Sequence, residues 1–171
     1  MSYKPLDFEK VFGIVAHVKR VLNKALELFA EEEGWEGRTG GYFCLADKTD
    51  GLPLLIVQVG EIPEVKAGKY LSFCQEKARR LAKNLSHASS WESRDPNQEK
   101  WGGAIRAEKM NGLILSFSGL PELGDEAVML TAYCLAENMY WKVVFEETKI
   151  IAACSSNKYR LPLLKAFSPY R

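Results

Sequence analysis

The sequence has little with which to hold a metal ion. Its 171 residues include two histidines and four cysteines, and no Cys-x-x-Cys pair occurs. Two histidines cannot form a three-histidine metal site, and each cysteine lies in an apolar stretch, where a free thiol behaves as a small hydrophobic side chain. A chain of this length can bury about 70% of its unfolded surface. We therefore expect one domain, residues 1–171, that folds without disulfides or a structural metal.

The motifs of the common enzyme classes are also missing. There is no Walker loop, no Gly-x-Gly-x-x-Gly and no His-Glu-x-x-His. The segment Ser116–Gly119 does not meet the spacing of a Gly-x-Ser-x-Gly nucleophile elbow, because no glycine stands two residues before the serine. The glycines between residues 34 and 41 follow a helix and precede a strand, which is the reverse of a phosphate-binding loop. No reaction can be named from these patterns.

Charge of one sign is not in excess either. Twenty-three Lys and Arg residues against 22 Asp and Glu residues give a net charge of +1, whereas a nucleic-acid-binding protein usually carries a basic excess. The basic run within residues 77–83 is typical of the solvated face of a helix. We therefore expect no nucleic-acid partner.

Long hydrophobic runs are absent as well. No stretch approaches the roughly 18 apolar residues that a membrane span needs. Residues 1–5 lack the apolar centre of a secretion signal. These features predict a cytoplasmic protein without a membrane partner.

What the sequence does contain is a clear change of period along the chain. Apolar residues recur every three or four positions from an N-cap at Asp7 to the neighbourhood of Gly34, which predicts a helix. The short apolar runs 42–46 and 54–59 flank Asp50-Gly51 and predict a β-hairpin.

A second helix is expected over residues 69–84. Its apolar positions form one stripe, which leaves Lys77, Arg79 and Arg80 for the outer surface. The polar stretch 86–100 follows, and a long irregular loop of this kind is often functional.

The second hairpin has the stronger signal. Strand-like runs 102–107 and 113–118 flank Asn111-Gly112, the pair that suits a type I′ turn because both positions need a positive φ. Residues equidistant from such a turn pair across the hairpin, which places Ile105 opposite Ser118.

A third helix is expected to run to about Met139, and its body, 127–136, is apolar nearly all round. We further expect a strand over 141–145 and a helix over 146–154. The third helix exposes more apolar surface than one sheet face can cover, so we expect a homo-oligomer. The side chains behind this expectation are Met129, Leu130, Tyr133, Leu135 and Met139.

Several short motifs, taken in order, resemble the HbpS-like and GlcG-like family. That family has a first hairpin with an Asp-x-x-Gly turn, an Ala-x-x-Lys-Ala-Arg helix, a Gly-Gly strand, a Gly-x-hydrophobic strand ending in Ser-Gly, and a helix beginning Asp-Glu. The corresponding segments are Ala46–Gly51, Gln75–Arg80, Gly102–Ile105, Asn111-Gly112, Leu115–Gly119 and Asp125–Ala127.

The resemblance covers residues 8–140 and makes 141–171 an extra C-terminal segment. It implies an α+β, profilin-like layered fold with a five-stranded antiparallel sheet, helices on both faces, and a homo-oligomer. Some members bind or degrade haem or sense iron, and some are encoded with glycolate-oxidation genes. Haem is thus one candidate cofactor, although no haem-ligating histidine can be carried over to this sequence.

The candidate site is a pocket at the end of the sheet, where the 86–101 stretch, the Gly-Gly strand start and the Ser-Gly turn should meet. Glycines allow a ligand to approach the backbone, and an arginine can pair with a ligand carboxylate. The expected ligand-binding residues are His87, Ser90, Trp101, Gly102, Gly103, Arg106, Ser118, Gly119, Asp125 and Glu126.

Several of these residues have more than one interpretation. His87 can ligate a metal or haem iron, or can cap a helix as a solvated histidine. Trp91 and Trp101 can form a wall for a planar ligand, or can anchor the loop. Asp125 and Glu126 can act as an acid/base pair, or can complement a helix dipole.

Three functions follow. The first is a small-ligand-binding protein, for a tetrapyrrole or a small organic acid. The second is an enzyme acting on a small molecule, with His87 or Asp125 as the acid/base group. The third is an oligomeric scaffold or sensor subunit without catalysis.

Overall fold

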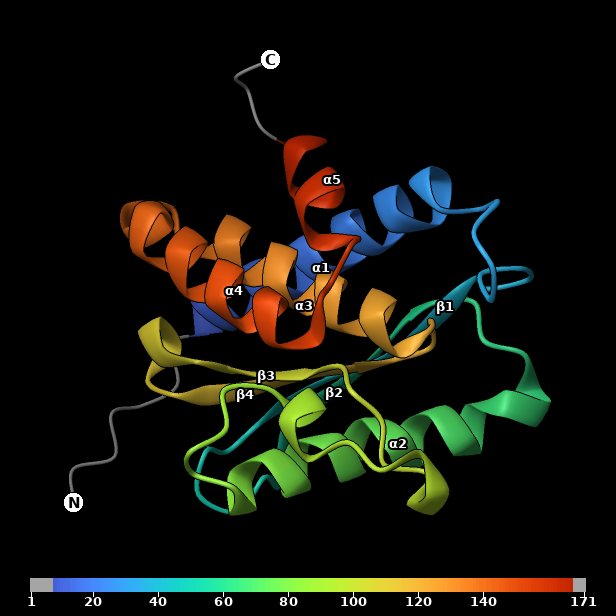
Figure 1. Ribbon diagram of the computed structural model, residues 1–171, viewed down its shortest axis with the longest axis horizontal. Helices are drawn as coiled ribbons and strands as arrows, with labels where there is room; N and C mark the ends of the chain where they lie inside the picture. Colours follow the sequence, from blue (N-terminus) through green and yellow to red (C-terminus); the bar gives the residue numbers. More distant parts are fainter. Residues whose placement is uncertain (1–7, 168–171) are drawn as a thin grey trace.

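The computed structural model describes residues 8–167, which form a four-stranded antiparallel sheet with helices on both faces (Figure 1). The strand order is β2-β1-β4-β3, so each hairpin contributes one central and one edge strand. The expected α+β class is confirmed. The main elements are α1 Phe8–Leu28, β1 Gly40–Ala46, β2 Pro53–Gly60, α2 Glu64–Lys83, β3 Ala104–Ala107, β4 Leu113–Ser118, α3 Glu122–Ala136, α4 Trp141–Ser155 and α5 Arg160–Lys165.

The sheet has four strands within residues 8–167, not the five that the family resemblance implies. The stretch between α2 and β3 does reach the free edge of β3, where Ser89 forms an isolated bridge with Ile105. It then turns into a short 3₁₀ helix, Ser90–Ser93, which a capping box between Ser89 and Glu92 stabilises. This turn ends the pairing after one residue.

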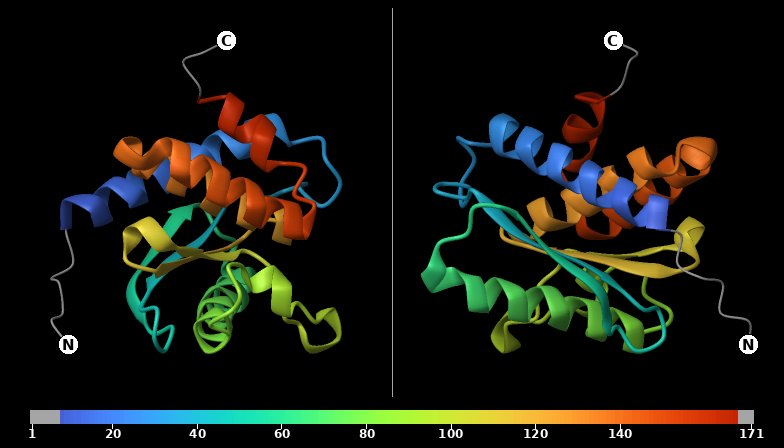
Figure 2. Two further views of the ribbon diagram at one scale, coloured as in Figure 1. Left: turned by 60° about the vertical axis from the view of Figure 1, so that its left-hand side comes forward. Right: turned by 180° about the vertical axis from the view of Figure 1, so that it is seen from behind.

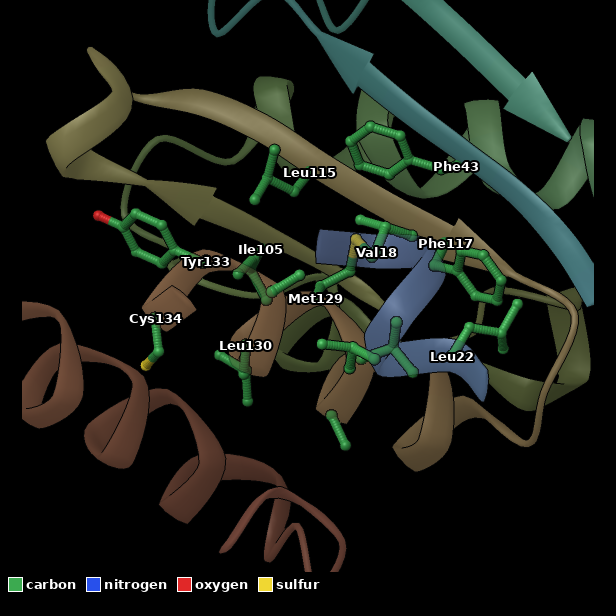
Figure 3. Close-up of a cluster of buried hydrophobic side chains, with 14 of the residues drawn as sticks. Val18, Leu22, Phe43, Ile105, Leu115, Phe117, Met129, Leu130, Tyr133 and Cys134 are labelled. Atoms are coloured by element: carbon green, nitrogen blue, oxygen red, sulfur yellow. The ribbon is translucent and has the colours of Figure 1, made fainter. Parts of the chain in front are cut away.

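The larger hydrophobic core lies between the sheet and the pair α1 and α3. Because side chains alternate along a strand, Phe43, Leu115 and Phe117 all point to this face (Figure 3). Val18 and Leu22 of α1 meet them there and are fully buried. The apolar stripe of the first predicted helix is therefore its core-facing side.

Helix α3 lies in the middle of this side of the molecule. It contacts the sheet, α1, α4 and α5, and Figure 2 shows α4 and α5 packed outside it. Met129, Leu130 and Tyr133 are consequently fully buried within the chain. Their apolar surface, which led us to expect an oligomer, is thus covered by the chain's own helices. Met139 lies beyond the end of α3 and is 90% exposed.

Helix α2 covers the opposite face of the sheet. The apolar cluster there is smaller and combines short side chains such as Cys74 and Ala78 with Leu81 and Ile114. Polar side chains fill much of the remaining space, as described below.

The C-terminal region differs from the expectation at one point. Residues 141–145 do not form a strand but begin helix α4. Val144, Thr148 and Ile151 are buried at helical spacing, and this period of three to four residues overrides the β-branched composition of the segment. The helix expected over 146–154 is confirmed. The N-cap expected at Asp7 lies outside the described residues.

The second hairpin has a different turn from the one expected. Asn111 and Gly112 do have positive φ values, 60° and 74°. They follow a short 3₁₀ turn, however, so the connection is longer than a two-residue type I′ turn. The longer connection displaces the register, and Ile105 lies opposite Leu115 rather than Ser118.

Within residues 8–167, every helix falls short of the length or the apolarity that a membrane crossing requires.

Candidate functional site

The residues 84–103 connect α2 to β3 and pack beside the acidic start of α3, and we refer to them as the 84–103 connection (Figure 1). The backbone N–H of Gly102 donates to Oε2 of Glu122 at 3.0 Å. The turn after β4 reaches the same place, because the N–H of Gly119 donates to Oδ1 of Asp125 at 3.2 Å. The connection and the turn therefore meet in space, as the sequence led us to expect.

A buried ion pair lies at the centre of this meeting point. Lys77 of α2 donates to Oδ2 of Asp125 at 2.7 Å and to the carbonyl oxygen of Phe117 at 2.9 Å. Asp125 also accepts from the N–H of Leu120 at 2.8 Å. The expectation that Lys77 lies on the outer surface is wrong, since the residue is 1% exposed. Its partner is distant in sequence, so helical periodicity could not reveal it.

The Asp125 carboxyl is enclosed to the same degree. Burial raises the pKa of Asp125 to about 6, while Lys77 and the Leu120 N–H act to lower it. The geometry, with an ammonium and two N–H groups around one carboxylate, is that of an ionised aspartate at neutral pH. At 2% exposure this group has no route to a substrate, so its interpretation as an acid/base residue gains no support.

Gly103 is needed for this ion pair to form. Its φ is +117°, and a Cβ atom there would lie 2.6 Å from the Cβ of Asp125 and 2.9 Å from Nζ of Lys77. A Cβ on Gly102 would lie 2.8 Å from the ring of Trp91. The two glycines that we expected to admit a ligand instead admit the protein's own side chains.

Arg80 binds the 84–103 connection at its middle and near its C-terminal end. Its guanidinium donates to the carbonyl oxygens of Ser90, Ser93 and Trp101 and to the carboxylate of Glu76. The side chain is 9% exposed, so its expected place on the outer surface is also wrong. The planar fork of arginine presents five N–H donors in a fixed geometry, which suits several oxygens at fixed positions.

The two tryptophans of the connection are covered by an arginine. The guanidinium carbon of Arg94 lies 4.9 Å from the ring centre of Trp91 and 5.8 Å from that of Trp101. Arg94 is held in place by an ion pair with Glu122 at 2.7 Å. The planar group against these indoles is thus part of the protein, which favours the anchoring interpretation over a wall for a planar ligand.

The other predicted site residues also make internal contacts. Ser90 is fully buried and its Oγ accepts from the N–H of Ala104 at 3.0 Å. Arg106 donates to the carbonyl oxygen of Leu81 at 2.9 Å and to that of His87 at 3.4 Å. Arg106 therefore holds the end of α2 against the start of the connection.

The side chain of His87, unlike those of Ser90 and Arg106, has a buried polar atom without a partner in the described part of the chain. Its Nδ1 atom is buried and has no hydrogen-bond partner among residues 8–167. Ser118, by contrast, sits in the sheet, paired with Tyr42 and 3% exposed.

Glu126 points away from Asp125, toward the C-terminal helices. Its carboxylate accepts from Oγ of Ser89 at 2.7 Å, from Nδ2 of Asn157 at 2.9 Å, and from Oγ of Ser155. Burial raises the pKa of Glu126, and these neutral donors oppose the rise. The residue ties the 84–103 connection to the end of α4, a role that sequence reasoning did not anticipate.

Four of the predicted residues, Gly102, Gly103, Gly119 and Asp125, do gather around the start of α3. Arg106 and His87 lie instead at the C-terminal end of α2. Seven of the ten make close contacts within the chain, either through hydrogen bonds of their polar groups or because a glycine lets another side chain approach. These seven are residues 90, 102, 103, 106, 119, 125 and 126. Whether any of the ten binds a ligand stays a prediction.

An open hollow lies beside this cluster, between the outer face of α2 and the 84–103 connection, and we refer to it as the α2 hollow. Its volume is about 390 Å³. Arg79 and Lys83 enter from α2 and Lys100 from the connection, while Ser72 and Gln75 supply neutral polar groups. Of the basic run that we expected to form a solvated helix face, Arg79 and Lys83 do remain exposed. Both line the hollow.

Among residues 8–167, no three His, Cys, Asp or Glu side chains gather closely enough to hold a metal ion. Comparison of the chain with protein-family models, with curated proteins and with solved structures finds no match. The resemblance to the HbpS-like and GlcG-like family therefore remains a hypothesis based on the ordered motifs.

Proposed function

We propose that the protein binds a small organic acid in the α2 hollow. The observation that carries this proposal is an excess of uncompensated positive charge. Arg79, Lys83 and Lys100 line the hollow, and within residues 8–167 none of them has a carboxylate ion-pair partner. Glu76, the carboxylate of the hollow, is already paired with Arg80 at 2.6 Å. Converging cations with neutral donors between them suit a ligand carboxylate.

The order of elements supports the wider family hypothesis. Helix, hairpin, helix, hairpin and helix follow one another, and the two faces of the sheet are both covered. This order suits a profilin-like layered domain of the HbpS-like or GlcG-like kind. An organic acid is in keeping with that resemblance, since some members are encoded with glycolate-oxidation genes.

A tetrapyrrole is the weaker candidate. Arg94 already covers both indoles of the connection, and a large apolar ring prefers an apolar pocket, whereas the α2 hollow is cationic. The unpartnered Nδ1 of His87 is the observation in favour of haem. A haem absorbance band that His87→Gln abolishes would therefore replace the organic acid with a tetrapyrrole.

The proposal is tested by calorimetric titration with acetate, malonate and citrate. We expect the affinity to rise with the number of carboxylates and to fall as salt is added, because exposed charges are screened. The Arg79→Gln/Lys83→Gln variant should lose at least tenfold in affinity, about 1.4 kcal/mol.

The matched control is Lys19→Gln/Lys142→Gln, which removes two exposed positive charges on α1 and α4. This variant should bind as the unaltered protein does. Equal losses in the two double variants would mean that overall charge, and not the α2 hollow, attracts the acid.

A further inference from the structure

A second hollow, of about 360 Å³, lies on the other face of the sheet, and we refer to it as the α1 hollow. It is enclosed by α1, the C-terminal end of α3 and the turn between β3 and β4. Ile14, Met110 and Ala136 give it an apolar floor. The charged and polar side chains that line it are those of Glu9, Lys10, His17 and Glu137. It shares no lining residue with the α2 hollow.

A glycine lines this hollow. Gly13 lies in the interior of α1, where glycine destabilises a helix relative to alanine because its backbone loses more freedom on folding. Packing does not require the glycine, since a Cβ atom built there meets no atom within 4 Å. A larger side chain at this position would occupy the hollow itself.

Glu137 brings a negative charge that is poorly compensated. The residue is 4% exposed and forms the C-terminal cap of α3, where the helix dipole is itself negative. Its ion-pair partner among residues 8–167 is Lys10, whose Nζ lies 3.4 Å from Oε1 and whose side chain is 53% exposed. A carboxylate held in this way attracts a further cationic donor.

His17 lines the same hollow and carries a ring nitrogen without a hydrogen-bond partner among residues 8–167. Its Nδ1 is buried and has no partner within the described part of the chain. Burial, helped by the charge of Arg20, lowers the pKa of the imidazole, so the ring is neutral at pH 7 and Nδ1 can accept a proton donor.

We propose that the α1 hollow is a binding site for a small organic ammonium compound that carries an alkyl or aryl group. The ammonium donates to the carboxylate of Glu137 and to Nδ1 of His17. The hydrocarbon part lies on Ile14, Met110 and Ala136, in the space that Gly13 leaves free. A neutral molecule of the same shape lacks the positive charge that pairs with the Glu137 carboxylate, and an anionic one is repelled by it.

The test uses n-butylammonium as the probe, with n-butanol and butyrate as neutral and anionic molecules of similar shape. NMR spectra of the 171-residue protein report the imidazole of His17 and the backbone amides of Gly13 and Glu137. We expect saturable shifts with butylammonium at millimolar concentration and at least tenfold weaker binding of the other two. Bound ammonium should also lower the titration midpoint of His17 further than butanol does, because a nearby positive charge disfavours the imidazolium in addition to the effect of burial.

Two substitutions locate the site. Glu137→Gln keeps the shape but removes the charge, and should weaken butylammonium binding at least tenfold. Gly13→Leu fills the hollow and should abolish binding. Gly68→Leu is its matched control, because Gly68 is also inside a helix with no atom within 4 Å of a built Cβ, and it should bind normally.

The proposal is overturned if butanol binds as tightly as butylammonium, if the shifts persist in Gly13→Leu, or if no saturable shift occurs. Should Gly13→Leu fail to fold, the comparison of Glu137→Gln with the unaltered protein, and of ammonium with alcohol, still decides the outcome.

Discussion

The two faces of the sheet are filled in different ways. Toward α1 and α3, the interior is dominated by large apolar side chains such as Phe43 and Phe117. Toward α2, Lys77, Arg80 and Arg106 enter the interior and are matched to oxygen atoms at fixed positions. Apolar packing depends on volume and shape, whereas a buried charge depends on one particular partner. The two faces should therefore respond differently to substitution.

The largest effect should come from Lys77→Ala. Removing the ammonium leaves Asp125 as an uncompensated buried charge, and breaking such a pair costs roughly 3–5 kcal/mol. Urea unfolding measures the loss. Arg79→Ala, two residues away on the exposed side of α2, is the control and should stay within about 0.5 kcal/mol. Similar values for both variants would mean that the ion pair does not matter to stability.

A somewhat smaller effect is expected from Gly103→Ala. The new Cβ must displace Asp125 or Lys77, and a non-glycine residue resists the positive φ, so we expect a loss of roughly 2–4 kcal/mol. Gly112→Ala shares the positive φ, but its nearest neighbour is the flexible side chain of Lys48 at 3.2 Å. It should lose about 1 kcal/mol. Thermal unfolding of the two variants separates backbone strain from the collision with the ion pair.

The pH dependence of stability offers a finer comparison. The pKa of Asp125 is about 6 in the folded chain, above its ordinary value of 3.8, so the folded state holds this proton more tightly than the unfolded state. The stability that this group contributes is therefore fully present below its ordinary pKa and is lost as the pH rises through about 6. Glu126, whose pKa burial also raises, acts in the same direction.

Urea midpoints measured from pH 4 to 7 test this prediction. This range covers most of the interval between the ordinary pKa of 3.8 and the folded-state pKa of about 6. The decline should be shallower in Asp125→Asn than in the unaltered protein. The control is Glu32→Gln, because the pKa of Glu32 is lowered by its hydrogen bond to Lys158 and its contribution has the opposite sign. A slope that Asp125→Asn leaves unchanged would argue against the raised pKa.

The smallest effect is expected on the apolar face. Leu115→Met keeps the volume and the apolar character of a fully buried side chain, and such exchanges usually cost less than about 1.5 kcal/mol. Thermal unfolding should show a modest decrease with a single sharp transition. A loss as large as that of Lys77→Ala would remove the distinction between the two faces.

The same distinction explains what could be predicted from the sequence. Apolar spacing identified α1, α2 and α3, and the hairpin patterns gave the antiparallel sheet and the position where Gly119 meets Asp125. Helical periodicity alone places a lysine on the solvent side. It contains no information about a partner such as Asp125, which lies 48 residues from Lys77 in the sequence. The signal available was that both residues fall within the ordered family-like motifs.

The turn between β3 and β4 and the C-terminal region were harder to predict from the sequence, for a related reason. Asn111-Gly112 correctly indicated two positive φ values, but the length of the connection depends on the 3₁₀ turn before it, which has no comparable marker. Residues 141–145 have a strand-like composition, and only packing against α3 selects the helix. Local patterns fix local dihedral angles, whereas register and burial depend on the rest of the fold.

The hydrogen bonds of Glu126 have a consequence for the order in which its surroundings can form during synthesis. Two of its hydrogen-bond donors, Ser155 and Asn157, follow it by 29 and 31 residues. While the ribosome still holds those residues, the carboxylate has only Ser89 from this set, and the outer side of α3 lacks α4 and α5. The outer side of α3 thus stays uncovered until α4 and α5 have been made, and their docking is the step that covers it.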